Sequence, residues 1–128
     1  MIFLITIGRI ITLEDRLLVH AEKLLLIIQA PSSRRKSFRQ AAAAIALVVE
    51  NEKRIEHMME LYAQVEELTA SPAGTVERNL RGLITLCWQR GGRKPFLELT
   101  GLDFPEKPDN SHFIEALAVW LLRHCSPP

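Results

Sequence analysis

Two arginines and a glutamate with the chemistry to contact DNA lie near the start of a predicted helix over residues 72–89. They are Glu77, Arg78 and Arg81. An arginine guanidinium can donate two parallel hydrogen bonds to O6 and N7 of guanine, which discriminates against other bases by about 1–3 kcal/mol. A glutamate can accept a hydrogen bond from the amino group of cytosine. We therefore expect Arg78 to read a base, and Glu77 either to read one or to hold an arginine in position.

The predicted helix has a start signal and an apolar side. Ser71 is a suitable N-cap, and Pro72 suits the first helical position because its missing N–H costs nothing there. Apolar residues then recur with helical spacing at Val76, Leu80, Leu83, Ile84 and Cys87. This stripe must face a core, so the charged residues lie on the exposed side. That layout is typical of the second helix of a helix-turn-helix, although an ordinary amphipathic helix has the same periodicity.

The rest of the chain predicts an all-α fold, a compact bundle of about six helices that contains the helix-turn-helix. Residues 1–13 form a short apolar N-terminal arm or strand, and residues 14–128 form a single helical domain. An arm this apolar would be a liability if exposed, so it either covers the core or contacts another subunit. The other expected helices begin near Thr12, Ser32 or Ser33, Glu52, Pro95, and Asn110 or Ser111. Met59 is among the residues expected to face the core.

The charges are segregated, although the net charge is only +1. Residues 34–39 hold four positive charges and no negative one, and residues 74–94 hold five positive charges and one negative. If the two stretches lie side by side, they can neutralise several phosphates, although solvated helix faces would give the same pattern. The candidate backbone-contacting residues outside the predicted recognition helix are Arg34, Arg35, Lys36, Arg93, Lys94, Lys107, Asn110 and Ser111. Helix capping is the other role open to the last two.

Three stretches of the chain carry a family pattern. They are Val76-Glu77-Arg78 with Leu80-Arg81, Ile84 and Trp88; Lys107-Pro108-Asp109-Asn110-Ser111 with Phe113-Ile114; and Leu61-Tyr62 with Val65. Together they resemble the C-terminal DNA-binding effector domain of the sporulation master regulator, stage zero sporulation protein A, over roughly residues 14–124. The resemblance implies a sequence-specific transcription regulator that binds double-stranded DNA, as a homodimer, in the cytoplasm and at the nucleoid.

The resemblance also assigns site residues. Thr75, Glu77 and Arg78 match base-contacting positions, and Arg81 matches a backbone-contacting one. Thr75 departs from the pattern, since the family places an arginine there. Glu66 and Thr69 depart as well, at the turn between the two helices. In the family a phospho-accepting receiver domain precedes this one. The chain has no room for it, so we expect a stand-alone homologue or a separately expressed effector domain.

Other functional classes receive little support. There is no nucleophile–base pair, no cysteine–histidine cluster and no glycine-rich phosphate loop, so we expect no enzyme activity, metal, cofactor or small-molecule substrate. Cys87 and Cys125 lack metal-ligand spacing and are expected to be reduced. The apolar arm is too short to cross a membrane. The alternative that remains is a helical protein-interaction or dimerisation module that kept the fold and lost DNA binding.

Overall fold

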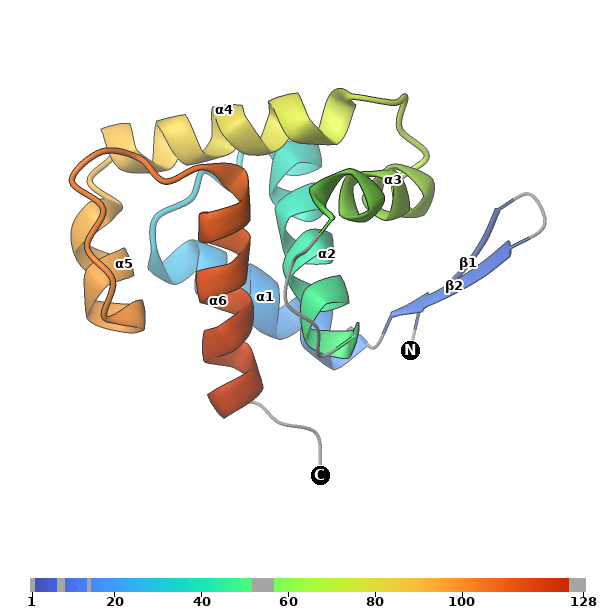
Figure 1. The fold of residues 1–128 in the computed structure, drawn as a ribbon, viewed down its shortest axis with the longest axis horizontal. Coiled ribbons are helices and arrows are strands. Elements are labelled where there is room, and N and C mark those ends of the chain that lie inside the picture. Colours follow the sequence, from blue (N-terminus) through green and yellow to red (C-terminus); the bar gives the residue numbers. More distant parts are fainter. Residues whose placement is uncertain (1, 7–8, 14, 52–56, 125–128) are drawn as a thin grey trace.

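The computed structural model describes residues 2–6, 9–13, 15–51 and 57–124. Within these ranges the chain forms a β-hairpin followed by six helices (Figure 1). The elements are β1 (Ile2–Thr6), β2 (Arg9–Leu13), α1 (Asp15–Ile27), α2 (Arg35–Asn51), α3 (Met58–Leu68), α4 (Thr75–Gln89), α5 (Arg93–Thr100) and α6 (Asn110–His124). The predicted bundle of about six helices is therefore confirmed.

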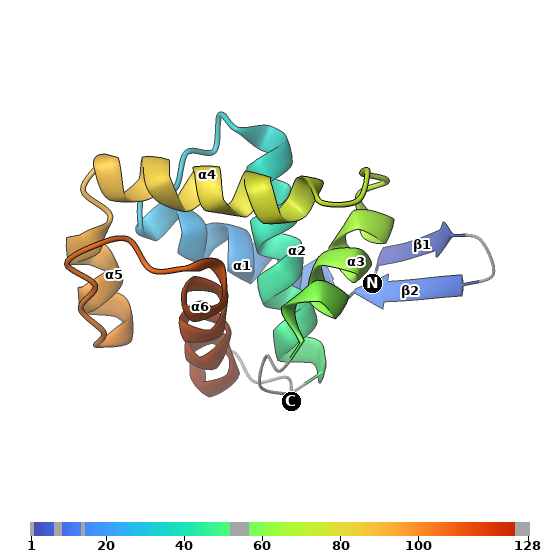
Figure 2. The same cartoon turned by 45° about the horizontal axis from the view of Figure 1, so that its top comes forward.

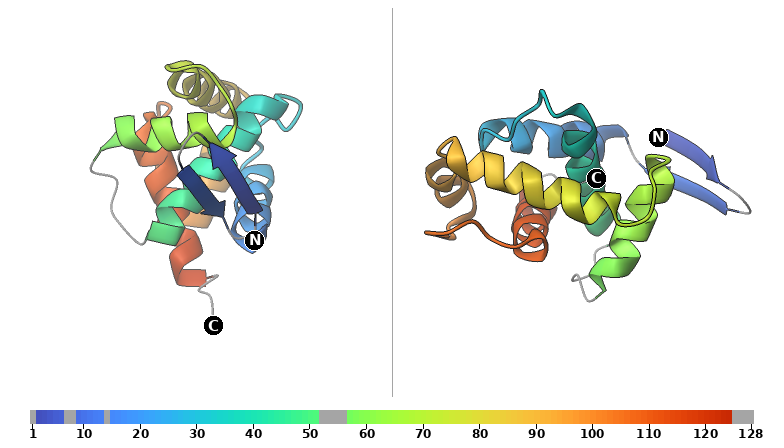
Figure 3. Two further views of the ribbon diagram at one scale, coloured as in Figure 1. Left: turned by 90° about the vertical axis from the view of Figure 1, so that its right-hand side faces the viewer. Right: turned by 90° about the horizontal axis from the view of Figure 1, so that it is seen from above.

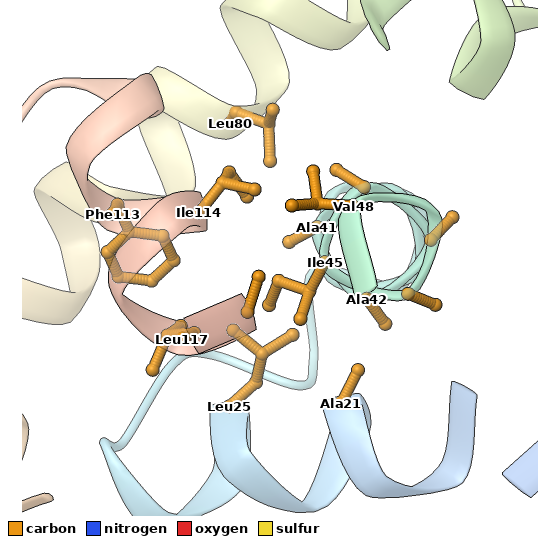
Figure 4. Packing of buried hydrophobic residues seen from close by; sticks show 14 of the residues in the cluster. Ala21, Leu25, Ala41, Ala42, Ile45, Val48, Leu80, Phe113, Ile114 and Leu117 are labelled. Atoms are coloured by element: carbon orange, nitrogen blue, oxygen red, sulfur yellow. The ribbon is translucent and has the colours of Figure 1, made fainter. Parts of the chain in front are cut away.

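Helix α2 lies at the centre of the body, and α1, α3, α4 and α6 all pack against it (Figures 1 and 2). Every residue from position 40 to position 49 is buried. Most of these are alanines and β-branched residues, whose short side chains let neighbouring helices approach on several sides. Figure 4 shows Ala21 and Leu25 of α1 on one side of Ile45, with Ile114 and Leu117 of α6 on another.

An aromatic cluster fixes the C-terminal end of α4 against α5 and α6. Phe96 and Phe113 are fully buried and stack with ring centroids 5.7 Å apart, and Trp88 meets Phe96 edge-on at 5.3 Å. The indole Nε1 of Trp88 also donates a hydrogen bond to the carbonyl oxygen of Phe104, at 2.9 Å. The aromatic cluster therefore holds the C-terminal end of α4 in place against α5 and α6.

The apolar arm contains two strands rather than one. β1 and β2 pair antiparallel in the register Ile2↔Leu13 to Thr6↔Arg9. β1 approaches α3 and β2 approaches α2, but most of the hairpin extends beyond the helical body (Figures 1 and 3). Both outer edges of this sheet lack a strand partner among the described residues.

Several predicted helix boundaries are wrong. Thr12 lies in β2 and does not begin a helix, since α1 begins at Asp15. α2 begins at Arg35, two or three residues after the predicted serines, and α3 begins at Met58, whereas most of its predicted first turn, residues 52–56, lies outside the described residues. Met59 is 78% exposed and does not face the core.

Candidate nucleic-acid interface

Helix α4 lies across the N-terminal end of α2 and presents one long side to solvent (Figures 1 and 3). Its apolar stripe is buried as the periodicity predicts, with Val76, Leu80, Leu83, Ile84 and Cys87 all at most 1% exposed. Arg78 and Arg81 are exposed, whereas Thr75 and Glu77 are half-buried. The charged front of the helix is thus accessible while its back is anchored in the core.

The start of α4 differs from the predicted one. The helix begins at Thr75, and its N-cap is Gly74 in the left-handed conformation, with φ of 82°. Ser71 and Pro72 therefore lie outside the helix. The capping interaction comes from Glu66 of α3, whose Oε2 accepts a hydrogen bond from the backbone N–H of Gly74 at 2.6 Å. This contact satisfies a backbone donor at the positive end of the helix dipole and ties the two helices of the helix-turn-helix together.

Glu66 and Thr69, the two departures at this turn, both have partners in the structure. The Glu66 side chain is half-buried and bonds to the backbone N–H of the N-cap residue of α4. Thr69 Oγ1 donates to the carbonyl oxygen of Val65 at 2.7 Å, and Leu68 provides the buried apolar contact that Thr69 lacks. The turn therefore tolerates a charged and a hydroxyl side chain where the family pattern has small and apolar ones.

Four cations gather around one open groove beside α4. The groove has a volume of about 490 Å³, and Arg34, Arg78, Arg81 and Lys107 are among its lining residues. They come from three segments that are distant in sequence: the bend before α2, α4 itself, and the loop before α6. The structure thus brings together Arg34 from the first predicted basic stretch and Arg78 and Arg81 from the second, with Lys107 from outside both, and such a cluster can neutralise phosphates.

The cations of this groove differ in their partners. Arg81 Nη1 lies 2.8 Å from Glu77 Oε1, so Glu77 holds an arginine in position within the same helix. Lys107 Nζ donates to Thr85 Oγ1 at 2.7 Å, which draws the loop before α6 towards α4. Arg78 forms no hydrogen bond or ion pair with the described part of the chain. The N–H donors of the Arg78 guanidinium are therefore available to a ligand.

The remaining predicted backbone contacts are more scattered. Arg35 and Lys36 are exposed in the first turn of α2, next to Arg34. Arg93 and Lys94 are exposed at the start of α5 and do not line the groove. Arg93 makes a two-point ion pair with Asp103, at 2.8 and 3.0 Å, and this hydrogen bonding holds the pKa of the Asp103 carboxyl below its usual value.

Asn110 does not have the placement expected of a phosphate contact. Its side chain is only 9% exposed, and its Nδ2 donates to the Tyr62 hydroxyl at 3.0 Å and to the carbonyl oxygen of Glu77 at 3.1 Å. Both amide hydrogens are therefore used inside the protein. The pair of bonds joins the start of α6 to α3 and to the first turn of α4.

Neither Asn110 nor Ser111 caps α6. The N-cap is Asp109, whose Oδ1 accepts from the backbone N–H of His112 at 2.9 Å and from Ser111 Oγ at 3.0 Å. The backbone hydrogen bond from His112 is the main cause of the lowered pKa of the Asp109 carboxyl. An aspartate at this position accepts from a free N–H of the first turn, as an N-cap should.

Sequence reasoning missed the polar residues that support α4 from inside. Gln40 is fully buried and contacts both the turn before α4 and Asn79 within it. The available signal was a glutamine at the start of an otherwise apolar run over residues 40–49. A polar side chain in such a run should find a hydrogen-bond partner, but periodicity cannot identify which one.

Two further classes of site are not found in the described part of the chain. No group of three or more histidine, cysteine, aspartate or glutamate side chains there is arranged to hold a metal ion. None of the helices described is long and apolar enough to cross a membrane.

Comparison with known proteins identifies the family. No curated protein and no solved structure matches the chain significantly. The family described as sporulation initiation factor Spo0A C terminal matches residues 22–121, which include the C-terminal part of α1 and all of the later helices except the end of α6. It is a family of DNA-binding regulatory domains rather than of enzymes. The chain belongs to the Spo0A C-terminal family of DNA-binding effector domains.

Proposed function

We propose that this protein regulates transcription by binding double-stranded DNA in a sequence-specific manner, with α4 in the major groove. The observation that carries the proposal is Arg78 at the front of α4, which is exposed, pairs with no described residue and lines a groove with three more cations. Such an arginine can give base discrimination while its neighbours bind phosphates.

The other residues of the interface divide into two roles. Thr75 and Glu77 lie at the front of α4 with Arg78 and contact bases, and Glu77 also orients Arg81 through their ion pair. Phosphates are contacted by Arg81, Arg34, Arg35, Lys36 and Lys107. Lys94 and Ser111 are peripheral contacts, and Arg93 would first have to leave Asp103. Asn110 does not contact DNA, because its side-chain donors are used inside the protein.

Replacing Arg78 with alanine should remove the preference for one base pair of the target site. The guanidinium supplies discrimination worth about 1–3 kcal/mol, so the ratio of specific to non-specific affinity should fall roughly 10- to 100-fold. The measurement is a selection of bound sequences from random duplexes, followed by titration of the best duplex and a scrambled one.

Arg35→Ala is the matched control, since Arg35 is exposed at the start of α2. It should weaken binding to all duplexes alike and reduce the dependence on salt concentration by about one unit of log–log slope. An unchanged sequence preference in Arg78→Ala would refute the role of Arg78. Absence of duplex binding by the wild type would favour the protein-interaction module instead.

We also propose that the protein forms a homodimer through its β-hairpin. A two-stranded hairpin alone is marginally stable in water, and an open strand edge offers backbone groups for pairing with another chain. The hairpin has an almost wholly apolar sequence and two outer edges that pair with no described strand. A second copy can pair with one of these edges and so form a continuous four-stranded sheet.

Sedimentation of the full chain and of a chain that begins at residue 14 tests this dimer. We expect a concentration-dependent dimer for the full chain and a monomer for the shortened one, with the same helical circular dichroism. Dimers of equal stability in both would place the contact elsewhere. A monomeric full chain at micromolar concentration would refute the proposal.

A further inference from the structure

Gln40 is a polar side chain in the middle of the apolar core. It lies on α2, is 0% exposed, and follows the exposed Arg39 directly. The next nine residues are alanines and aliphatic residues, all buried. Burial of an amide costs free energy unless its donor and acceptor groups are all bonded, so its hydrogen bonds decide what this residue does.

The amide of Gln40 joins the two helices of the helix-turn-helix to α2. Its Nε2 donates to Ser71 Oγ at 3.0 Å and to Thr69 Oγ1 at 3.3 Å, both in the turn before α4. Its Oε1 accepts from Asn79 Nδ2 of α4 at 2.8 Å. One side chain thus reaches across from the central helix to the turn and to the exposed helix at once.

The hydrogen bonds of this network have a fixed direction. Thr69 Oγ1 donates its only proton to the carbonyl oxygen of Val65 at 2.7 Å, so it must accept from Gln40 and from Ser71. Gln40 Oε1 can only accept a hydrogen bond, so the amide nitrogen of Asn79 faces it and donates. Both the nitrogen and the oxygen of the Gln40 amide are therefore bonded, and a satisfied buried polar network favours a specific geometry of the segments that form it.

Apolar packing alone would define the position of α4 less sharply. The buried residues of α2 after Gln40 are alanines and other aliphatic side chains, and apolar contacts have no directional preference. The bond to Asn79 lies one residue from Arg78, and Asn79 lines the same groove as Arg34 and Arg81. A displacement of the helix at Asn79 would therefore move Arg78 with it.

We propose that Gln40 is a positioning residue for sequence recognition: its hydrogen bonds to Ser71, Thr69 and Asn79 fix the rotation and height of α4 on the body. Arg78 is then held where both of its hydrogen bonds to one base can form. This inference rests on the proposed function, because it assumes that α4 reads DNA. Gln40 thereby contributes to base discrimination although it is buried in α2 and does not contact DNA.

Gln40→Met tests this role, since methionine has a similar length and shape but lacks the amide. We expect the ratio of specific to non-specific affinity to fall about 10-fold or more, because the two-point contact of Arg78 with its base is no longer held in place. Affinity for a scrambled duplex and its dependence on salt should stay unchanged, since no phosphate contact is touched.

Hydrogen exchange gives a second readout that does not need DNA. In Gln40→Met the amides of residues 78–80, the first of α4 with intrahelical acceptors, should exchange faster, while those of residues 83–87, near the aromatic cluster, should keep their rates. Ile45→Val is the matched control, because Ile45 is fully buried in α2 and makes no side-chain hydrogen bond. It should lower overall stability without changing either the affinity ratio or this local pattern.

Unchanged discrimination in Gln40→Met, or an equal loss in Ile45→Val, would overturn the proposal. If Gln40→Met does not fold, Thr69→Val replaces it; this variant removes one partner in the turn and should lower the affinity ratio in the same direction. If the wild type prefers no duplex, the proposed function fails, and the exchange pattern alone then decides whether Gln40 holds α4.

Discussion

Replacing Gly92 with alanine should lower the free energy of unfolding by about 3 kcal/mol, because the added methyl group would overpack a closely packed site. A Cβ at this position would lie 2.5 Å from Cys87 Sγ, 2.8 Å from the carbonyl oxygen of Cys87 and 2.9 Å from that of Ile28. Two of these three atoms belong to the backbone, so no change of side-chain rotamer can relieve the contact.

The tight contact at Gly92 joins the ends of α1 and α4. The backbone N–H of Gly92 donates to the carbonyl oxygen of Cys87 at 2.9 Å, and the Cys87 thiol donates to that of Ile28 at 3.1 Å. Burial raises the pKa of this thiol to about 11, so it remains a neutral hydrogen-bond donor at physiological pH. An added methyl group would separate the two helix ends and break both bonds.

Gly82→Ala is the matched control, with an expected effect of the opposite sign. Gly82 is an exposed residue inside α4, and a Cβ there meets nothing within 4 Å. Alanine is better than glycine in a helix interior by about 0.8–1.0 kcal/mol, so this variant should be more stable than the wild type. Unfolding in urea, monitored by circular dichroism, measures the free energy of unfolding of both variants. A loss below 1 kcal/mol in Gly92→Ala would show that the helix ends can separate cheaply.

The buried side of α4 could be predicted from the sequence, whereas its start could not. The stripe from Val76 to Cys87 has one periodicity and allows one orientation, and the structure confirms it. Ser71 has the right type and place for an N-cap, but its hydroxyl accepts from Gln40, which is 31 positions away. A local capping rule cannot foresee that a distant amide competes for the same oxygen.

The start of α6 and the structure of the N-terminal arm likewise could not be predicted from local sequence rules. Three consecutive residues from position 109 can all cap a helix; Asn110 bonds instead to Tyr62 and Glu77, and Asp109 takes the role. In the arm, nearly every residue is apolar, so there is no alternation from which a strand pairing could be read. Predictions from periodicity are correct where one pattern dominates. They fail where several local structures fit the sequence equally well and contacts between distant residues determine which one forms.

The groove beside α4 is another product of such distant contacts, and reversing its charge should have the largest effect on DNA binding. Arg34→Glu combined with Lys107→Glu replaces two phosphate-binding cations from different segments by carboxylates. We expect affinity for every duplex to fall about 100-fold or more at low salt. The slope of log affinity against log salt concentration should decrease by about 2, since each phosphate contact contributes about 0.9.

Arg16→Glu combined with Lys23→Glu is the control for net charge. Both residues are exposed on α1, and neither lines the groove beside α4. The two double variants carry the same net charge, so any difference between them reports where the charge lies. Because the Debye length at physiological salt is about 8 Å, charges on α1 should act only weakly on DNA held at α4. Equal losses of affinity in both variants would mean that the protein binds DNA by its overall charge, without a defined groove.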